Sequence, residues 1–205
     1  AVAWCALRQE LIDAAWGGSD PRPGEAKLAW WAEELDGWAR GRRRHPLGIA
    51  LQRHAAPWPQ LAMATTSLPA TRDPAVDSNA AASALTPFAR AITGIEAVLF
   101  AVAKPALATD VVPGLLAEKV FLLVDAAAPL QVRARLGAAT AEHAVARAWA
   151  GDLLQEGQRP AGSRPARILA ALERQRLHRF AQGAPLLQAV PRWASLWATW
   201  RAARD

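Results

Sequence analysis

Hydrophobic positions recur at intervals of three and four along most of the chain, which is the spacing of an amphipathic helix. The clearest example lies in residues 24–41, where one apolar stripe is formed by Leu28, Trp31, Leu35 and Trp38. Strand-like alternation does not extend over more than a few residues, and no segment repeats at a fixed period. The pattern therefore predicts an all-α protein.

Glycine and proline divide this pattern into helices, because glycine often ends a helix and proline cannot continue its hydrogen bonds. We expect roughly seven to nine helices joined by short loops. The main ones are predicted at residues 3–16, 24–41, 47–55, 80–103, 110–128, 130–155, 167–182 and 191–204. The last has an apolar stripe formed by Trp193, Leu196, Trp197 and Trp200. No linker divides the chain, so residues 1–205 are predicted to form a single helical bundle.

Composition agrees with a helical domain. Alanine, the strongest helix former, occupies 50 of the 205 positions. Hydrophobic residues make up 52% of the chain and charged residues 20%, which is typical of a globular protein. The ten tryptophans are expected to anchor helix contacts, each with an N–H group that needs a partner. The one cysteine, Cys5, excludes an internal disulfide and a cysteine metal cluster, and we expect it to be buried.

The formal net charge is +6, and 21 of the 24 basic residues are arginine. Such a bias favours an anionic partner (a diphosphate, a lipid headgroup or nucleic acid) or reflects a GC-rich gene. Nine arginines lie in residues 159–204, and the predicted helix with Arg174, Arg176 and Arg179 also has an apolar stripe. Its polar face is either a surface for anionic membranes or nucleic acid or, as we favour, a solvated face. No recognised nucleic-acid module accompanies it, which disfavours nucleic acid.

The sequence also bears on location. No apolar run approaches the roughly 18 residues that a membrane span needs, and no leader pattern is found at the start. We therefore expect a cytoplasmic protein, with association at the membrane surface left open. The chain begins with Ala1 rather than methionine, so preceding helices are not excluded.

The first predicted helix carries two carboxylates, Glu10 and Asp13, three residues apart. Carboxylates three or four apart point the same way from a helix and can share metal ions. Mg²⁺ prefers such oxygen ligands, and enzymes that ionise an allylic diphosphate need it to neutralise the leaving group. The alternative interpretation is that Glu10 and Asp13 form part of a solvated helix face.

This segment resembles the first aspartate-rich motif of the squalene/phytoene synthase family, in which an aromatic–Cys pair precedes Asp-Asp-x-x-Asp. Trp4 and Cys5 match the pair. Asp13 matches the last aspartate and Glu10 the second, whereas Gln9 stands in place of the first.

A later segment resembles the second motif of that family, Arg-Asp-x-x-x-Asp. Arg147 and Asp152 match the arginine and the last aspartate, whereas Ala148 replaces the first aspartate and has no ligand atom. Arg159 is similar to a later Gly-Arg element, at a different spacing. The Trp-rich helix of residues 28–36 also looks like the helix that follows the first motif in the family. Apart from the resemblance, Arg147 is expected to form a surface ion pair with Glu142 or Asp152.

The resemblance implies an isoprenoid-synthase-like helical bundle with a central cavity. It implies that Glu10, Asp13 and Asp152 would bind Mg²⁺ in an active member, and that Arg147 and Arg159 would hold a diphosphate. Family members are usually longer, with helices before the first motif that close the substrate pocket.

Because Gln9 and Ala148 stand where the family has aspartates, we favour a catalytically degenerate member without a cofactor. Such a protein is expected to bind an isoprenoid or another lipid, or to act on a protein partner as an assembly factor, as one member of the family does for respiratory complex I. One alternative is an active Mg²⁺-dependent prenyltransferase that condenses allylic diphosphates. A further alternative is an adaptor for anionic membranes or nucleic acid that uses the arginine-rich C-terminal region.

Overall fold

The computed structural model describes residues 1–137, 141–155, 161–186 and 188–204. All regular structure within these residues is helical, so the prediction of an all-α protein is confirmed. The α-helices are α1 (Val2–Trp16), α2 (Arg22–Ala39), α3 (Leu47–Leu51), α4 (Trp58–Thr65), α5 (Ser78–Leu99), α6 (Ala108–Leu123), α7 (Leu130–Leu136), α8 (Ala144–Gln155), α9 (Arg164–Ala181) and α10 (Arg192–Arg204). Two short 3₁₀ helices are η1 (Pro69–Arg72) and η2 (Val124–Ala127). Among the described helices, none combines the length and the apolar character that crossing a bilayer requires.

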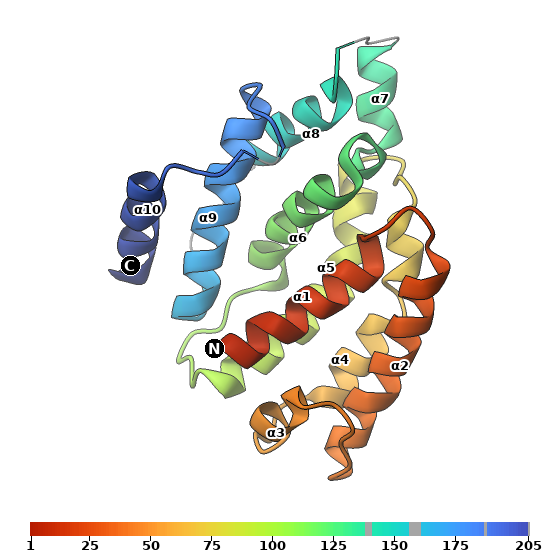
Figure 1. Ribbon diagram of the computed structural model, residues 1–205, viewed down its shortest axis with the longest axis vertical. Helices are drawn as coiled ribbons and strands as arrows, with labels where there is room; N and C mark the ends of the chain where they lie inside the picture. The colour runs from red at the N-terminus through yellow and green to blue at the C-terminus, as the bar shows by residue number, and fades with distance from the viewer. Residues whose placement is uncertain (138–140, 156–160, 187, 205) are drawn as a thin grey trace.

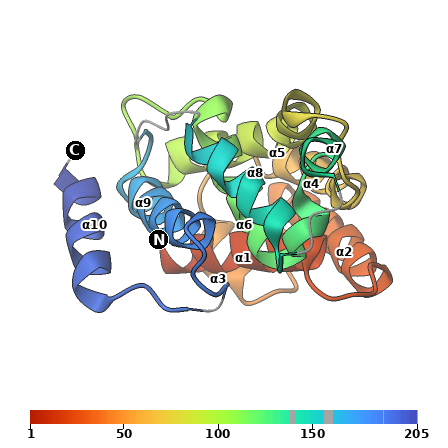
Figure 2. The same cartoon turned by 90° about the horizontal axis from the view of Figure 1, so that it is seen from above.

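The helices follow one another across the molecule as a series of neighbours (Figure 1). At one end, α2 packs on α4 and on α1, and α4 packs on α5. Helices α5 and α6 pack together in the middle, and α6 also contacts α1, α8 and α9. Helix α10 packs against α9 and lies at the outer edge of the molecule in both views (Figures 1 and 2). One side of α10 is therefore turned away from the bundle.

Tryptophans fill much of the core, as the composition predicted. Six are buried: Trp4, Trp16, Trp31, Trp38, Trp58 and Trp149. Four of their N–H groups donate to a side chain or carbonyl, in the pairs Trp4–Glu96, Trp16–Thr71, Trp38–Glu34 and Trp58–His54. Each of these bonds satisfies a polar group that burial would otherwise leave unpaired, so the rings can pack without that cost.

The buried carboxylate of Glu34 holds the basic turn that follows α2. It is 1% exposed and accepts hydrogen bonds from the backbone N–H groups of Arg44 (2.7 Å) and His45 (2.8 Å). The Trp38 indole (2.8 Å) and the Arg44 guanidinium (3.1 Å) also donate to it. Burial alone would raise the pKa of Glu34, but these donors outweigh burial and lower the pKa to about 2. The turn is therefore fixed by an ionised carboxylate in the core.

The predicted helix over residues 130–155 is wrong, because the chain breaks there into α7 and α8. Gly137 follows α7 with a φ of +59°, in the left-handed region that glycine adopts without strain. In the first turn of α8, the N–H of Ala146 donates to the carboxylate of Asp125 at 2.8 Å. That carboxylate satisfies one of the donors that every helix start leaves unpaired.

The last helix carries the apolar stripe named from the sequence, and the structure places that stripe on the outside of the molecule. The apolar stripe of α10 is exposed along its length, from Trp193 and Leu196 to Trp197 and Trp200. On the other side of the helix Ala202 is buried, and Ala194 and Ala198 are half-buried. Because alanine adds little bulk, α10 can approach α9 closely through this side and leave its large side chains outside.

We expect Glu34→Gln to destabilise the protein by roughly 1–3 kcal/mol at pH 7, because an amide cannot accept all of the donors around it. Since the pKa of Glu34 is lowered from 4.5 to about 2, its contribution is present above pH 4.5 and is lost as the pH falls toward 2. That shift corresponds to about 3 kcal/mol by linkage. Denaturant unfolding from pH 7 down to pH 3 measures the difference between wild type and variant, which should shrink as the pH falls.

The neighbouring Glu33→Gln is the matched control for this experiment. The Glu33 side chain is 72% exposed and pairs with Arg44 at 3.5 Å, so its loss should change stability by less than about 1 kcal/mol. An equal effect of the two substitutions would contradict the structural role of Glu34.

Candidate functional site

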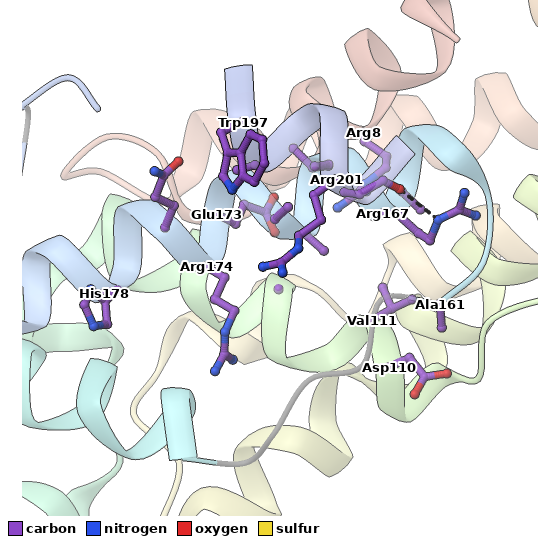
Figure 3. Close-up of a pocket in the computed structure, with 18 of the residues that line it drawn as sticks. Arg8, Asp110, Val111, Ala161, Arg167, Glu173, Arg174, His178, Trp197 and Arg201 are labelled. Carbon is purple, nitrogen blue, oxygen red and sulfur yellow. Dashed lines mark hydrogen bonds between the residues drawn. The ribbon is translucent and has the colours of Figure 1, made fainter. Parts of the chain in front are cut away.

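Helices α9 and α10 form one side of a groove whose other side comes from α1, α5 and α6 (Figure 3). This α9–α10 groove encloses about 510 Å³. Its apolar lining consists mostly of small side chains: Ile92, Val111, Gly114, Ala161, Ala166, Leu169, Ala170, Ala171, Trp193, Ala194, Trp197, Ala198 and Ala202. Its polar lining is Arg8, Glu96, Asp110, Arg167, Glu173, Arg174, Gln175, His178 and Arg201.

Arg167 joins α10 to the start of α9. Its Nε donates to the carbonyl oxygen of Ala202 at 3.0 Å, and its Nη1 donates to that of Gly162 at 2.8 Å (Figure 3). The guanidinium thus satisfies a carbonyl in the last turn of α10, which has no partner within its own helix. The position of α10 along the groove follows from this contact and from the alanines that face α9.

Glu96 forms part of the buried end of the groove and is 6% exposed. One carboxylate oxygen accepts the indole N–H of Trp4 at 2.9 Å, and the other accepts the hydroxyl of Ser163 at 3.0 Å. The Ser163 hydroxyl in turn accepts the N–H of Ala166 at 3.2 Å and caps the start of α9. Glu96 therefore links α1 and the first turn of α9 to α5.

Arg8 brings a cation into the same buried region and is 7% exposed. Its guanidinium lies 3.6 Å from the carboxylate of Glu118. Burial alone would lower the pKa of Arg8, but neighbouring carboxylates, Glu118 first among them, outweigh burial, and the pKa is raised. Arg8 therefore stays charged among acidic side chains contributed by α5, α6 and α9.

Glu173 on α9 lies against α6. Burial, and then the neighbouring charge of Glu118, raise the pKa of Glu173 well above its usual range. A Cβ atom at Gly114 would lie 2.8 Å from the Glu173 carboxylate, so glycine leaves the space that this side chain occupies. The shift favours the uncharged acid, which donates as well as accepts hydrogen bonds.

Several polar atoms beside the groove have no hydrogen-bond partner among the described residues: Arg8 Nε, Glu118 Oε2, Glu173 Oε1 and Gln175 Oε1. A buried polar atom without a partner costs on the order of 1–3 kcal/mol. These atoms are enclosed by protein, so the polar groups that a bound molecule can reach are the exposed side chains of the lining, Arg174 and Arg201 among them. Chemically, the arrangement can hold an amphipathic molecule by its apolar body and by its polar end.

The two carboxylates predicted from the first motif lie outside the groove. Glu10 forms an ion pair with Lys27 of α2 at 2.5 Å. Asp13 is exposed and accepts a hydrogen bond at 2.8 Å from Gln9, one turn earlier. Cys5 is also exposed, which corrects the expectation that it is buried.

The residues predicted from the second motif lie near α7 and the end of α9. Asp152 forms an ion pair with Arg135 of α7 at 2.8 Å and lines a separate hollow of about 680 Å³. Arg147 donates to the backbone carbonyl of Glu142 at 3.0 Å, and its guanidinium lies 5.7 Å from the centre of the Phe180 ring. Ala148 packs against the core. Arg159 lies outside the described residues.

The structure does not gather the three predicted magnesium ligands. Helix α6 contacts both α1 and α8, and it runs between them in Figure 1. Glu10, Asp13 and Asp152 are each engaged by a different neighbour. Within the described part of the chain, no group of three or more His, Cys, Asp or Glu side chains is placed to hold a metal ion. The residues present therefore do not fit a diphosphate-binding magnesium cluster, and no catalytic step follows from them.

Sequence reasoning missed the residues that do line the groove, namely Arg8, Glu96 and Glu173. A signal was present for two of them. Arg8 follows Leu7 and precedes Leu11 on the buried side of its helix, and Glu96 follows Ile95 in an apolar helix. Charged residues are rarely fully buried unless they are paired, so a charge in an apolar stripe indicates a partner elsewhere in the fold.

Comparison of the chain with protein-family models, with curated proteins and with solved structures returns no match. The resemblance of its sequence motifs to the squalene/phytoene synthase family therefore stays a prediction.

We expect Glu173→Gln to flatten the dependence of stability on pH. Because the pKa of Glu173 is raised in the folded state, the folded protein keeps a proton that the unfolded chain releases above about pH 4.5. Wild-type stability should therefore fall as the pH rises through this window, by up to about 1.4 kcal/mol per pH unit. Glutamine mimics the uncharged acid, so the variant should gain stability relative to wild type between pH 5 and pH 8, measured by denaturant unfolding.

The control is Glu25→Gln, at an exposed side chain of α2. This substitution should leave the pH profile between pH 5 and pH 8 unchanged. A variant at Glu173 that loses more stability at pH 8 than at pH 5 would show that the carboxylate is needed in its ionised form.

Proposed function

We propose that this protein binds an amphipathic, lipid-like molecule in the α9–α10 groove and does not catalyse a metal-dependent reaction. One observation carries the proposal: a largely apolar groove of about 510 Å³ has two exposed arginines, Arg174 and Arg201, in its lining. That volume lies within the range of about 300–1,000 Å³ that small-molecule sites occupy.

The lining favours a molecule with a long apolar body. Alanine and glycine dominate the walls contributed by α9, α10 and α6, and Leu169, Trp193 and Trp197 add larger apolar surfaces. Burial of such a body releases roughly 25 cal/mol for each Å² of apolar surface removed from water. The exposed arginines Arg174 and Arg201 line the same groove, which favours a negatively charged end group.

The motif resemblance makes an isoprenoid the first candidate for this molecule, in a helical bundle of the isoprenoid-synthase type. The loss of aspartates at Gln9 and Ala148 and the separate ion pairs of the remaining carboxylates support binding without catalysis. Among the residues that the structure describes, no contact favours the active prenyltransferase. A role as an assembly factor on a protein partner is compatible with ligand binding but has no separate support from the groove.

We expect Ala170→Phe to weaken binding of farnesyl diphosphate by at least about tenfold, since the ring would occupy part of the groove. Ala170 lines the groove from α9. Isothermal titration calorimetry in EDTA, without added Mg²⁺, measures the affinity, and circular dichroism checks that the variant is folded. The matched control is Ala29→Phe, which makes the same change on an exposed position of α2. Equal affinity of Ala170→Phe and wild type, or no binding by wild type, would refute the proposal.

We also expect no condensed prenyl product when the protein is incubated with farnesyl or geranylgeranyl diphosphate and Mg²⁺. The physical reason is that Glu10, Asp13 and Asp152 do not meet around one cavity. Product analysis by mass spectrometry gives the answer. Turnover that Asp13→Ala abolishes would establish the enzymatic alternative, because Asp13 is exposed and its loss should change stability by only about 0.5 kcal/mol.

A further inference from the structure

Helix α10 presents a continuous apolar face to solvent. Its four large apolar side chains are 75%, 70%, 59% and 51% exposed, in the order Trp193, Leu196, Trp197 and Trp200. The spacing of three, one and three residues places all four within one side of the helix. Single exposed apolar residues are common on protein surfaces, but a contiguous patch of this size marks an interaction site.

Arginines border this face. Arg192 and Arg201 lie on its two flanks at helical spacing, and Arg204 follows at its C-terminal end. The rings of Trp197 and Trp200 stack with 5.2 Å between centroids, and the Arg204 guanidinium lies 4.6 Å from the Trp200 ring centre. Helix α10 contains no acidic residue, and residues 164–204 hold eight arginines against one acid, Glu173. The whole edge of the molecule is therefore positive.

We propose that this face of α10 docks on the surface of an anionic lipid bilayer. Tryptophan is suited to the boundary between headgroups and acyl chains, because its ring is apolar and its N–H remains able to bond. Helices that lie in this boundary combine such an apolar face with basic residues along its edges. Each arginine close to an anionic bilayer adds to the attraction.

Charge distinguishes this occupant from a second copy of the chain. A symmetric dimer places the same surface patch of both copies face to face. Such a dimer would bring together two faces that are bordered by arginines and carry no acidic residue, and like charges across an interface are unfavourable. An anionic bilayer offers the opposite charge along the whole face.

The docking face adjoins the groove, because Trp193 and Trp197 contribute to both (Figure 3 shows Trp197 beside Arg201). Docking would therefore place the mouth of the groove next to the lipid. The inference does not depend on the proposed ligand of the groove, since Leu196 and Trp200 belong to the face alone.

The test is co-sedimentation of the full chain with vesicles of phosphatidylcholine alone and with vesicles of equal parts phosphatidylcholine and phosphatidylglycerol. We expect binding to the anionic vesicles, weakened by added salt, and at least about a tenfold loss of binding in the double variant Leu196→Ser, Trp200→Ser. The matched control is Ile49→Ser, Met63→Ser, which replaces two exposed apolar residues on α3 and α4 and should bind as wild type does. Circular dichroism establishes that both variants are folded.

Three results would overturn the proposal. The first is that the wild-type protein does not co-sediment with anionic vesicles. The second is that the Leu196→Ser, Trp200→Ser variant binds these vesicles as strongly as wild type does. The third is analytical ultracentrifugation that shows a dimer which this variant dissociates, because the face would then belong to a second copy. Failure of farnesyl diphosphate binding alone would leave the vesicle result standing, so the two proposals fail separately.

Discussion

A carboxylate inside a helical bundle must be supplied with donors, and Glu96 receives them from two distant parts of the chain. The indole of Trp4 reaches it from α1 and the hydroxyl of Ser163 from the start of α9. The partners lie 92 and 67 residues away in sequence. Because hydrogen bonds hold their partners to within a few tenths of an ångström, Glu96 sets how closely α1 and α9 approach α5. The buried end of the groove depends on that spacing.

The same requirement recurs in the other half of the molecule, but over a short range. Glu34 gathers donors that lie four, ten and eleven residues along the chain, and together they fold the basic turn back on α2. Glu34 thus fixes a turn between segments that are close in sequence, whereas Glu96 joins helices that are far apart in sequence. Each stabilises its region because a buried acceptor left without donors would be costly.

The spacing of hydrophobic residues, together with the positions of glycine and proline, predicted much of this fold. The stripe of Leu28, Trp31, Leu35 and Trp38 is buried in α2 as expected, because its opposite face is clearly charged. In α10 the same spacing identifies an apolar stripe but does not predict which side of the helix packs against α9. Alanine is counted as neutral in such a pattern, yet Ala202 lies on the buried side of the helix. Packing by small side chains therefore cannot be read from the spacing of large ones.

The candidate site was less predictable, because its polar residues come from separate helices and form no motif. Arg8, Glu96 and Glu173 lie on α1, α5 and α9, and nothing in their spacing brings them together. The motif-like carboxylates were conspicuous because they are close in sequence. Closeness along a helix, however, also lets such groups bond to each other, as Gln9 and Asp13 do. A local cluster is therefore weaker evidence for a site than a single charge in an apolar stripe.

The small-residue side of α10 accounts for both surfaces for which a function is proposed. Alanines facing α9 allow α10 to lie close to it. Helix α10 then forms one wall of the groove, and its tryptophans face outward. Burial of each of those large side chains would release about 1.5–3 kcal/mol. Replacing the alanines with larger residues would fill the groove, whereas turning the helix would hide the tryptophans and unpair Arg167 from Ala202. The observed orientation keeps the groove open. It also leaves the exposed tryptophans free to be buried against a surface outside the chain.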